Sequence, residues 1–483
     1  MNNSEKLYKK LIEYSQGKAY PFHMPGHKRQ IMSMEDPYRF DLTEIDGFDN
    51  LHEAAGILKV EEERAARLYQ SEETHLMVNG STGGVLAGVA GVTRRGDRVL
   101  VVRNCHTSVY HALELNGLKP VFLWPELNEE LGIYYGITRE MVEKVLEKNS
   151  DIRAVIFTSP TYEGIFSDVK GICEAAHQRG IPCIVDEAHG AHLRWCQLPD
   201  SVAQGADVVI QSLHKTLPAL TQTALIHLNG SIISKERVRR MLGTYQTSSP
   251  SYVLMASISQ CLEWLEQESA EAFRIYEERV MALRKKLEEL KYIQLYTPDE
   301  LFDWGKLVIS TPLPKLTGRQ LYDELRDTYH LQMEMVSSKY VLAMTTVGDS
   351  PEGLKQLESA LDEMDWFYEM DAMAGALIAM DKEDAPEEEE GKKIKTFLVP
   401  EQAMNLAEAV NQLKENIPLV ESGGRVVGEY IYLYPPGIPM LIPGEVIHVK
   451  HIEKMEQYLA QGMEIHGGYD KETESISVLS EMK

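Results

Sequence analysis

Short apolar runs alternate with amphipathic helical stretches between residues 98 and 230, and this alternation restricts the chain to a small set of folds. Helical segments such as Thr138–Lys148 and Val169–Gln178 separate several of the runs. Strands that alternate with helices of this length usually pair in parallel and are covered by the helices. We therefore predict an α/β fold around a mostly parallel sheet, with strands at Arg98–Val102, Pro120–Leu123, Ala154–Phe157, Pro182–Val185 and Asp207–Ile210.

One connection in this region is too short for a parallel crossover. About ten residues separate the strand that ends near Gln211 from the next apolar run, Thr223–Leu228. A right-handed crossover that contains a helix needs about a dozen residues or more. We therefore predict that the run Thr223–Leu228 is antiparallel to its neighbour.

The sequence as a whole suggests three parts. Residues 1–60 are mixed and rich in turns, as in PFHMPGHK at 21–28, which predicts an amino-terminal arm. Residues 61–305 contain the alternating region and end in a long helical stretch, so they form the predicted major domain. A new apolar segment begins near Leu307, which predicts a smaller carboxy-terminal α/β domain at 306–483 with an acidic, charged loop at 381–393.

Charge and cysteine content exclude several classes of function. The chain has 74 Asp and Glu against 49 Lys and Arg, a net charge of −25, so nucleic acid and anionic membranes are unsuitable as main partners. The five cysteines are widely spaced and include no C-x-x-C pair, so we predict neither a disulfide framework nor a metal site. Reduced thiols and an amino terminus without a signal-peptide pattern favour a cytoplasmic location.

The first chemical motif is NGSTGG at Asn79–Gly84. It lies in the uncharged run Thr74–Thr93, which has the length of a membrane span but contains five glycines, and therefore predicts a loop that enters the small-residue helix Val85–Val92. Glycines allow close backbone approach, the hydroxyls of Ser81 and Thr82 can donate, and a helix amino terminus favours an anion. The motif predicts a phosphate cradle, and the alternative interpretation is a simple helix N-cap with a tight turn.

Two further motifs stand at the carboxyl ends of predicted strands, where open α/β sheets bind ligands. Asp186 opens DEAHG at 186–190, and Lys215 follows Ser212 and His214 in SLHKT at 212–216. Taken alone, the aspartate is also compatible with a helix cap, and the lysine with a solvated surface residue. Lys215 lies 29 residues beyond Asp186, at the end of the following strand, and this pairing downstream of an anion cradle favours a functional role for both.

Together the motifs indicate pyridoxal 5′-phosphate as the cofactor. Lys215 is predicted to form the Schiff base with the cofactor aldehyde, and Asp186 to keep the pyridine nitrogen protonated so that the ring is an electron sink. His106, in NCHTS at 104–108, is predicted to stack on the ring, although a lone histidine is more often a core or surface residue. The predicted phosphate ligands are Ser81, Thr82, Ser212 and His214.

The motifs in this order resemble the Orn/Lys/Arg decarboxylase group of fold-type I pyridoxal-phosphate enzymes, in the short bacterial form without an amino-terminal wing domain. In one place the chain departs from the family pattern, because Thr107 stands where the family has a lysine after the histidine. The resemblance spans nearly the whole chain and rests on FHMPGHK at 22–28, DNLHEAAG at 49–56, NGSTGG at 79–84, NCHTS at 104–108, SPTYEG at 159–164, DEAHGAH at 186–192, SLHKTLPALTQ at 212–222, TSSPSY at 247–252 and YPPGIPMLIPGE at 434–445.

The resemblance implies an aspartate-aminotransferase-like large domain with a seven-stranded sheet, a smaller carboxy-terminal α/β domain, and active sites shared within a homodimer or a larger homo-oligomer. It implies that Lys215 is the covalent anchor, Asp186 the pyridinium partner and His106 the stacking residue. The implied reaction is decarboxylation of arginine, lysine or ornithine to the corresponding amine and CO2, as in polyamine biosynthesis.

The same resemblance implies roles for residues that the motifs alone do not assign. His189 is expected near the phenolic oxygen of the cofactor. Ser249, or its neighbour Ser248, is expected to reach across a dimer interface toward the partner subunit's phosphate group. Both roles follow from the family pattern and not from composition or spacing.

A basic substrate needs an acidic partner at its far end, and two carboxylates are candidates. Glu334 lies in the Met-rich segment Leu331–Val336, and Glu445 lies in PGE at 443–445; either is equally compatible with a solvated carboxylate. Two other activities stay open at this point. One is another fold-type I enzyme such as an aminotransferase, and the second is a non-catalytic pyridoxal-phosphate-binding protein. An aminotransferase commonly clamps the substrate carboxylate with an arginine, and candidates are Arg319, Arg326 and Arg425.

Overall fold

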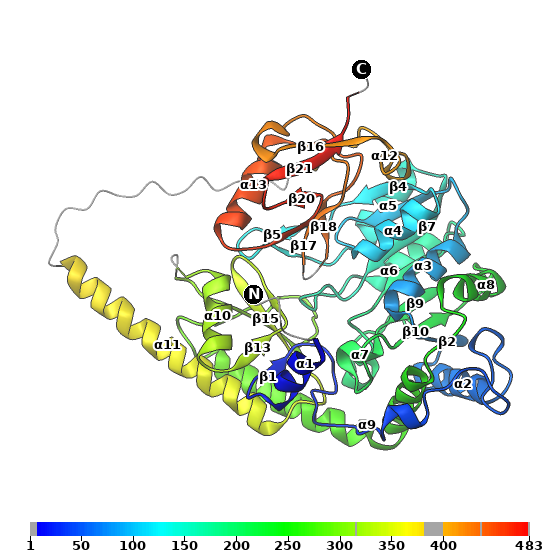
Figure 1. The fold of residues 1–483 in the computed structure, drawn as a ribbon, viewed down its shortest axis with the longest axis horizontal. Coiled ribbons are helices and arrows are strands. Elements are labelled where there is room, and N and C mark those ends of the chain that lie inside the picture. The colour runs from blue at the N-terminus through cyan, green and yellow to red at the C-terminus, as the bar shows by residue number, and fades with distance from the viewer. Residues whose placement is uncertain (1–6, 314–315, 381–398, 435–436, 482–483) are drawn as a thin grey trace.

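The computed structural model describes residues 7–313, 316–380, 399–434 and 437–481. It consists of a large α/β domain, a second and smaller α/β domain, and a carboxy-terminal β-rich unit that lies beside both (Figure 1). The predicted charged loop at 381–393 falls outside the described residues. Among the residues described, none of the helices has the length and apolar character needed to span a bilayer.

A seven-stranded sheet forms the centre of the large domain. Its strands run in parallel except for β10, which is antiparallel to both of its neighbours. The predicted strands and the predicted antiparallel run are therefore confirmed. In spatial order the strands are β2 (Glu73–Met77), β10 (Ala224–Leu228), β9 (Val208–Gln211), β8 (Cys183–Asp186), β7 (Ile152–Thr158), β3 (Arg98–Val102) and β4 (Lys119–Leu123).

Strand β2 is the element that the sequence prediction missed. The uncharged run Thr74–Thr93 was expected to begin as a loop, but residues 73–77 pair with β10, with Ala224 opposite Met77. The strand is short, lies at the sheet edge and contains Glu, Thr and His, so it lacks the Val/Ile/Leu composition of the buried strands. The second half of the same run is a helix, as predicted.

Helices cover both faces of the sheet. Right-handed crossovers place α3 and α4 on one face and α5 and α6 on the opposite face. Helix α3 can lie close to the strands because it is built from small residues: a Cβ at Gly84 would come within 2.9 Å of Ile210, and one at Gly88 within 3.1 Å of Val208. The bounds are α2 (Ile57–Tyr69), α3 (Gly80–Val92), α4 (Thr107–Leu115), α5 (Arg139–Lys148), α6 (Val169–His177), α7 (Leu213–Thr216) and α8 (Lys235–Tyr245).

The long helix α9 (Tyr252–Leu287) connects the large domain to the smaller one. The small domain has a four-stranded antiparallel sheet in the order β11-β12-β15-β14, packed against α9, α10 and α11. Its elements are β11 (Gln294–Leu295), β12 (Lys306–Ser310), α10 (Gly318–Asp327), β13 (Leu331–Met333), β14 (Met335–Val336), β15 (Tyr340–Met344) and α11 (Pro351–Met380).

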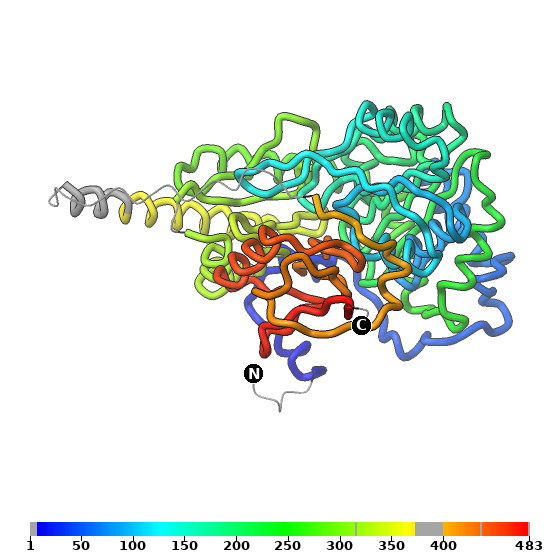
Figure 2. Tube along the Cα trace, turned by 90° about the horizontal axis from the view of Figure 1, so that it is seen from above, coloured from blue at the N-terminus to red at the C-terminus, as the bar shows by residue number. Residues whose placement is uncertain are grey.

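The predicted amino-terminal arm is in part a core element. Strand β1 (Tyr20–Phe22) pairs in parallel with β13 of the small domain, and Phe22 and Lys28 are buried. The first helix, α1 (Leu7–Gln16), has no buried residue, and Figure 2 shows it at the outer edge of the molecule. Residues 20–28 are therefore held between the two domains, close to the segment that carries Lys215.

The carboxy-terminal unit contains two small antiparallel sheets and two α-helices, and it docks on the large domain through Arg103. The guanidinium of Arg103 donates to the carbonyl oxygen of Pro439 at 2.7 Å and to Glu445 at 3.0 Å. The elements of this unit are α12 (Leu406–Ala409), β16 (Lys414–Pro418), β17 (Ile431–Leu433), β18 (Pro439–Leu441), α13 (Val449–Ala460), β19 (Ile465–Gly467), β20 (Tyr469–Asp470) and β21 (Ser475–Leu479).

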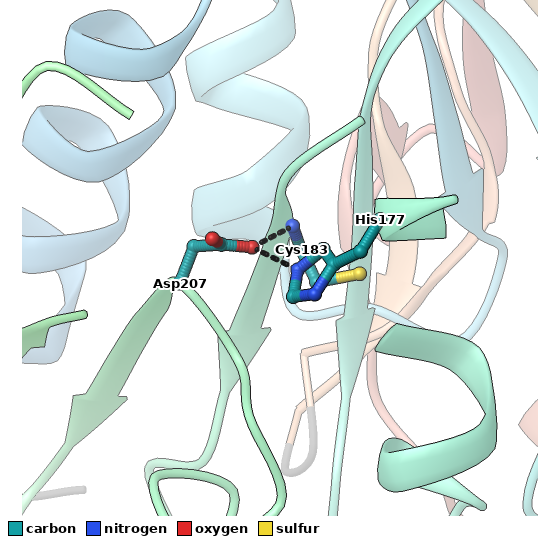
Figure 3. Close-up of side chains that lie close together, drawn as sticks. All are labelled: His177, Cys183 and Asp207. Atoms are coloured by element: carbon teal, nitrogen blue, oxygen red, sulfur yellow. Dashed lines mark hydrogen bonds and ion pairs between the residues drawn. The ribbon is translucent and has the colours of Figure 1, made fainter. Parts of the chain in front are cut away.

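At the amino-terminal edge of the large sheet, Asp207 joins three elements (Figure 3). One of its oxygens, Oδ2, accepts a hydrogen bond from His177 Nε2 and another from the backbone N–H of Cys183, each at 2.8 Å. A carboxylate, a histidine and a thiol resemble a zinc ligand set in composition. Here the oxygen that faces the histidine is already used by two donors, so we assign the group to holding the end of α6 against the starts of β8 and β9.

Candidate active site

Three polar segments meet at the carboxyl edge of the large sheet, where the sequence predicted a ligand site. Strands β3, β8 and β9 lead directly into residues 104–108, 186–189 and 212–215, and β7 lies between β3 and β8 in the sheet. Because these strands are parallel and adjacent, their carboxyl ends bring His106, Asp186 and Lys215 to one place although they are far apart in the sequence.

The amine of Lys215 lies in a chain of buried basic groups. Its Nζ is 3.1 Å from Nε2 of His189, and the other ring nitrogen of that histidine, Nδ1, is 3.2 Å from Nζ of Lys306 on β12. The ring of Tyr162 packs against the His189 imidazole with a centroid separation of 4.6 Å. The chain of contacts therefore crosses from the large domain to the small domain.

Burial adjusts the protonation of these groups toward their neutral forms. Burial lowers the pKa of Lys215, although the negative charges of Asp186 and Glu334 oppose this shift. Burial, together with the charges of Lys215 and Lys306, holds the pKa of His189 well below its ordinary value. An amine with a lowered pKa is more often unprotonated near neutral pH, and the unprotonated amine is the nucleophile.

Asp186 is a buried carboxylate that needs a cationic partner. Its Oδ1 accepts a hydrogen bond from the backbone N–H of Ala188 at 3.1 Å. Burial raises the pKa of Asp186, and the opposing effect of Lys215 does not offset it. A pyridinium nitrogen placed against this carboxylate would favour its ionised form, which is the role predicted for Asp186.

His106 follows β3 and caps helix α4. Its Nδ1 accepts a hydrogen bond from the backbone N–H of Ser108 at 3.2 Å, which fixes the ring orientation. Burial, followed by the charge of Lys215, lowers the pKa of His106 to about 4, so the ring is neutral near pH 7. Gly437 of the carboxy-terminal unit lies against the ring, since a Cβ at Gly437 would be 3.4 Å from its Nε2. A neutral ring held in this way is suited to stacking.

The predicted phosphate cradle adjoins the Lys215 segment. Helix α3 begins at Gly80, whose N–H donates to the carbonyl of Gln222 at 3.0 Å, and this tie brings Ser81 and Thr82 toward the loop after Lys215. Ser81 is half-buried and Thr82 is exposed. The hydroxyl oxygen of Ser212 is buried and has no hydrogen-bond partner among the described residues.

The remaining predicted cofactor ligands are placed less directly. His214 is half-buried, its Nδ1 lies 2.9 Å from the carbonyl oxygen of Thr223, and burial lowers its pKa to about 4. Its main-chain carbonyl accepts a hydrogen bond from Gly26 of the arm at 2.7 Å. Ser249 is exposed and contacts only Thr247, at 3.3 Å, within the part of its own chain that the structure describes. Its expected role across a dimer interface stays a prediction.

These residues fit pyridoxal phosphate. An amine, a buried carboxylate short of a cation, a neutral stacking ring and a helix amino terminus with nearby hydroxyls are the groups that this cofactor requires. The unpartnered Ser212 hydroxyl provides one further donor beside Lys215.

Of the two carboxylates predicted to bind substrate, Glu334 is near enough to the Lys215 amine for its charge to oppose the lowering of the Lys215 pKa. Its Oε2 accepts from the backbone N–H of Met24 at 2.8 Å and its Oε1 from the hydroxyl of Tyr162 at 2.5 Å. Glu334 is only partly buried, and it borders an opening of about 420 Å³. The opening is lined by Tyr14, His23, Met24, Tyr322, Gln332, Met333 and Glu334.

Glu445 is placed differently. It forms a buried ion pair with Arg103, in which both side chains are 2% exposed, and it also accepts from the backbone N–H of Ile442 at 2.9 Å. The sequence pattern did not show this partner, because Arg103 lies 342 residues away along the chain. Its charge is thus already compensated within the protein.

Sequence reasoning missed two side chains at the site, Lys306 and Tyr162. The signal for Lys306 was a lysine that opens the otherwise apolar run KLVIS at 306–310, and the signal for Tyr162 was its place in SPTYEG at 159–164. A lysine at the start of an apolar strand is more often solvated. Only the packing of β12 against the large domain shows that Lys306 is 2% exposed.

Comparisons with known proteins agree with this geometry. A family model for the Orn/Lys/Arg decarboxylase major domain matches residues 5–309, and one for the carboxy-terminal domain of the same family matches residues 389–479. The chain is 31% identical to the arginine decarboxylase of Bacillus subtilis (strain 168), over 99% of this chain and 98% of that protein. It is 25% identical to the constitutive lysine decarboxylase of Escherichia coli (strain K12), over 92% of this chain and 76% of that protein.

The fold has a close counterpart among solved structures. The crystal structure of a lysine decarboxylase from Francisella novicida superposes with a TM-score of 0.76 at 20% sequence identity, and covers 98% of this chain and 80% of that chain. The two family matches together cover most of the chain, and the fold is that of pyridoxal-phosphate decarboxylases. The chain therefore belongs to the Orn/Lys/Arg decarboxylase family and is a pyridoxal-phosphate-dependent decarboxylase.

Proposed function

We propose that this enzyme decarboxylates a basic amino acid, namely arginine, lysine or ornithine, and that Glu334 binds the positive end of the substrate side chain. The observation that carries the proposal is the position of the Glu334 carboxylate, which borders an opening and acts electrostatically on the Lys215 amine. A carboxylate has about four lone-pair sites, and two hydrogen bonds to Glu334 leave room for an ammonium or a guanidinium group.

Each residue of the candidate site has a separate proposed role in the reaction. Bound pyridoxal phosphate supplies an aldehyde and an electron-withdrawing ring that accepts the electron pair of the broken bond. Lys215 would provide the amine that holds the cofactor, and the same amine would then be available as a base and acid beside the reacting carbon. Asp186 would hold the ring nitrogen in its protonated form, and the neutral ring of His106 would cover the cofactor ring and exclude water from it.

The three arginines named above as candidates for an aminotransferase clamp are engaged in ion pairs, which favours decarboxylation. Arg319 donates to Asp323 at 2.9 Å, and Arg326 donates to the neighbouring Asp327 at 2.7 Å. Arg425 pairs with Glu415 in the carboxy-terminal unit at 2.6 Å. None of these three arginines lines the described opening beside Glu334. If none of the three holds the α-carboxylate, that group can stand perpendicular to the cofactor ring, the orientation in which its bond would be broken.

We extend the proposal to the oligomeric state, the substrate and the cellular location. The exposed Ser249 and the half-buried Ser81 suit a phosphate site that is completed by a second copy of the chain, so we propose a homodimer with shared active sites. Relatives that match nearly the full length are named arginine decarboxylases, so arginine is the first substrate to test. The product would be an amine of the polyamine type, formed in the cytoplasm.

Product analysis tests this proposal. The purified protein is loaded with pyridoxal phosphate and incubated separately with L-arginine, L-lysine and L-ornithine, and CO2 and the organic product are measured. We expect equal amounts of CO2 and amine from at least one of them, and none from the Lys215→Ala variant. A keto acid in place of an amine would assign an aminotransferase activity, and an absorbing but inactive protein would assign a non-catalytic binder.

A further inference from the structure

Lys306 reaches into the candidate active site from the small domain, where it contacts His189. It opens strand β12, its side chain is 2% exposed, and its Nζ meets Nδ1 of His189 at 3.2 Å. The opposite nitrogen of the same ring, Nε2, meets the Lys215 amine at 3.1 Å. A single imidazole thus stands between the buried Lys306 and the half-buried Lys215.

The hydrogen-bonding properties of the two side-chain types determine which ring nitrogen carries the proton. A neutral imidazole has one donor nitrogen and one acceptor nitrogen, whereas an ammonium group has three donors and no acceptor. If Lys306 carries the charge, Nδ1 of His189 must accept and the ring proton must be on Nε2. That N–H then points at Lys215, whose Nζ accepts it as a neutral amine.

The charges around Lys306 favour it as the protonated member of the chain. Burial lowers the pKa of Lys306 to about 8, which leaves the amine mainly protonated near pH 7, and the carboxylate of Asp303 supports that charge most strongly. The titratable groups that act on it or contact it are His189, Asp303, Glu334, Glu163, Lys215 and Lys28.

The Lys306 side chain is also held in place mechanically. Gly164, with a backbone φ of +96°, packs on its aliphatic part so closely that a Cβ there would lie 2.9 Å from the Lys306 Cγ. The same loop carries Tyr162, whose ring packs on His189. One loop therefore fixes both members of the contact.

We propose that Lys306 is a positioning residue, which holds His189 in the tautomer with its proton on Nε2 and thereby directs an N–H toward Lys215 and the cofactor that it carries. The positive charge of Lys306 also opposes a second positive charge on the nitrogen of Lys215. This inference rests on the proposed site, in which Lys215 is the covalent anchor, but it does not depend on which amino acid is the substrate.

Two substitutions at Lys306 separate its charge from its hydrogen bond. Lys306→Met removes both, whereas Lys306→Gln removes the charge and keeps an N–H donor for Nδ1. Lys28→Met is the matched control. Lys28 is an equally buried lysine in the same region, and it donates to the carbonyls of His23 and Met344, each at 2.8 Å. No hydrogen bond joins it to His189 among the described residues.

The first measurement is the absorbance of the cofactor-loaded protein as a function of pH, which reports the pKa of the nitrogen that joins Lys215 to the cofactor. We expect Lys306→Met and Lys306→Gln each to raise that pKa by about one unit, the effect of a unit charge two hydrogen bonds away at an effective dielectric constant of about 20 to 40. Lys28→Met should shift it by much less. A shift no larger than that of Lys28→Met would overturn the charge part of the proposal.

The second measurement is the ¹⁵N spectrum of His189 in selectively labelled protein, assigned by its loss in a His189→Phe variant. We expect the proton on Nε2 in the wild type and in Lys306→Gln, and a mixture of tautomers in Lys306→Met. A proton on Nδ1 in the wild type would overturn the tautomer assignment. If Lys306→Met does not fold, Lys306→Gln still tests the charge, and the wild-type spectrum still tests the tautomer.

The outcomes distinguish this inference from the proposed function. Normal spectra with the expected shifts, but no amine product, would refute the decarboxylation proposal and leave the role of Lys306 intact. Amine production with unshifted absorbance in Lys306→Met and Lys306→Gln would support decarboxylation and refute the role of Lys306.

Discussion

Glu334→Gln is the substitution that most directly tests how the substrate is recognised. Gln has nearly the same shape as Glu, and its amide oxygen can still accept from the Tyr162 hydroxyl or the Met24 backbone N–H. The substitution therefore removes the negative charge beside the opening and little else. Lys215, Asp186 and the cofactor cradle are not altered by it.

The expected loss follows from one charge-assisted contact. Hydrogen bonds to charged groups contribute about 1.5 to 3 kcal/mol. At about 1.4 kcal/mol per factor of ten, Glu334→Gln should lower kcat/KM for the basic amino acid by about 10- to 150-fold. Because the contact is made with the distal end of the substrate, most of the loss should be in KM and less in kcat, apart from any misplacement of the α-carboxylate.

Steady-state decarboxylation kinetics check this, with Glu163→Gln as the matched control. Glu163 belongs to the same loop as Tyr162, but its carboxylate accepts from the Tyr340 hydroxyl at 2.8 Å and does not line the opening. We expect Glu163→Gln to change kcat/KM by no more than about threefold. If Glu334→Gln retains wild-type kcat/KM, or if both variants lose activity equally, the recognition of the basic group by Glu334 is refuted.

Three further predictions concern stability. Gly88→Leu should lower the free energy of unfolding by about 1–3 kcal/mol, because a Cβ there lies 3.1 Å from Val208 Cγ1; an unchanged urea midpoint would contradict the close packing of α3. Glu445→Gln should cost about 3–5 kcal/mol, since it leaves the buried Arg103 charge unpaired, and thermal melting should show a smaller loss when Arg103→Met is added. Burial disfavours the charged form of His75, but its two neighbouring carboxylates outweigh burial and raise its pKa to about 9. Protonated His75 therefore contributes at most about 3 kcal/mol to the free energy of unfolding. This contribution is complete below pH ~6.5 and is lost as the pH rises through 9. His75→Gln should therefore be less stable than wild type at pH 6, with the difference reduced by pH 10; a pH-independent difference would contradict this assignment.

The sheet of the large domain could be predicted because its strands are buried on both faces. Such strands are continuous runs of Val, Ile and Leu, and the short link before Thr223 was enough to predict an antiparallel neighbour. The edge strand β2 was missed because its burial is achieved by contacts from distant elements and not by its own composition. The strand β1 was missed for the same reason, since it pairs with β13, about 310 residues later in the chain.

The candidate site was predictable where one strand end carries one functional group. Asp186, Lys215 and His106 follow parallel strands of one sheet, with β7 between β3 and β8, and the geometry of such sheets brings their ends together. The place of Lys306 at the site could not be predicted, because a run such as KLVIS does not indicate that its first residue faces another domain. The ion pair between Glu445 and Arg103 could not be predicted either, because it depends on how the carboxy-terminal unit docks on the large domain.

The position of Glu334 shows why the substrate is hard to read from motifs. Glu334 is the single residue between β13 and β14, and β13 is held by the amino-terminal strand β1. Its carboxylate is fixed by Met24 from the arm and by Tyr162 from the large domain. The distance from this carboxylate to the Lys215 amine, which limits the length of the substrate, is thus set by three segments packed together. A change in the arm that shifts Met24 should alter the preference among arginine, lysine and ornithine without touching any cofactor ligand.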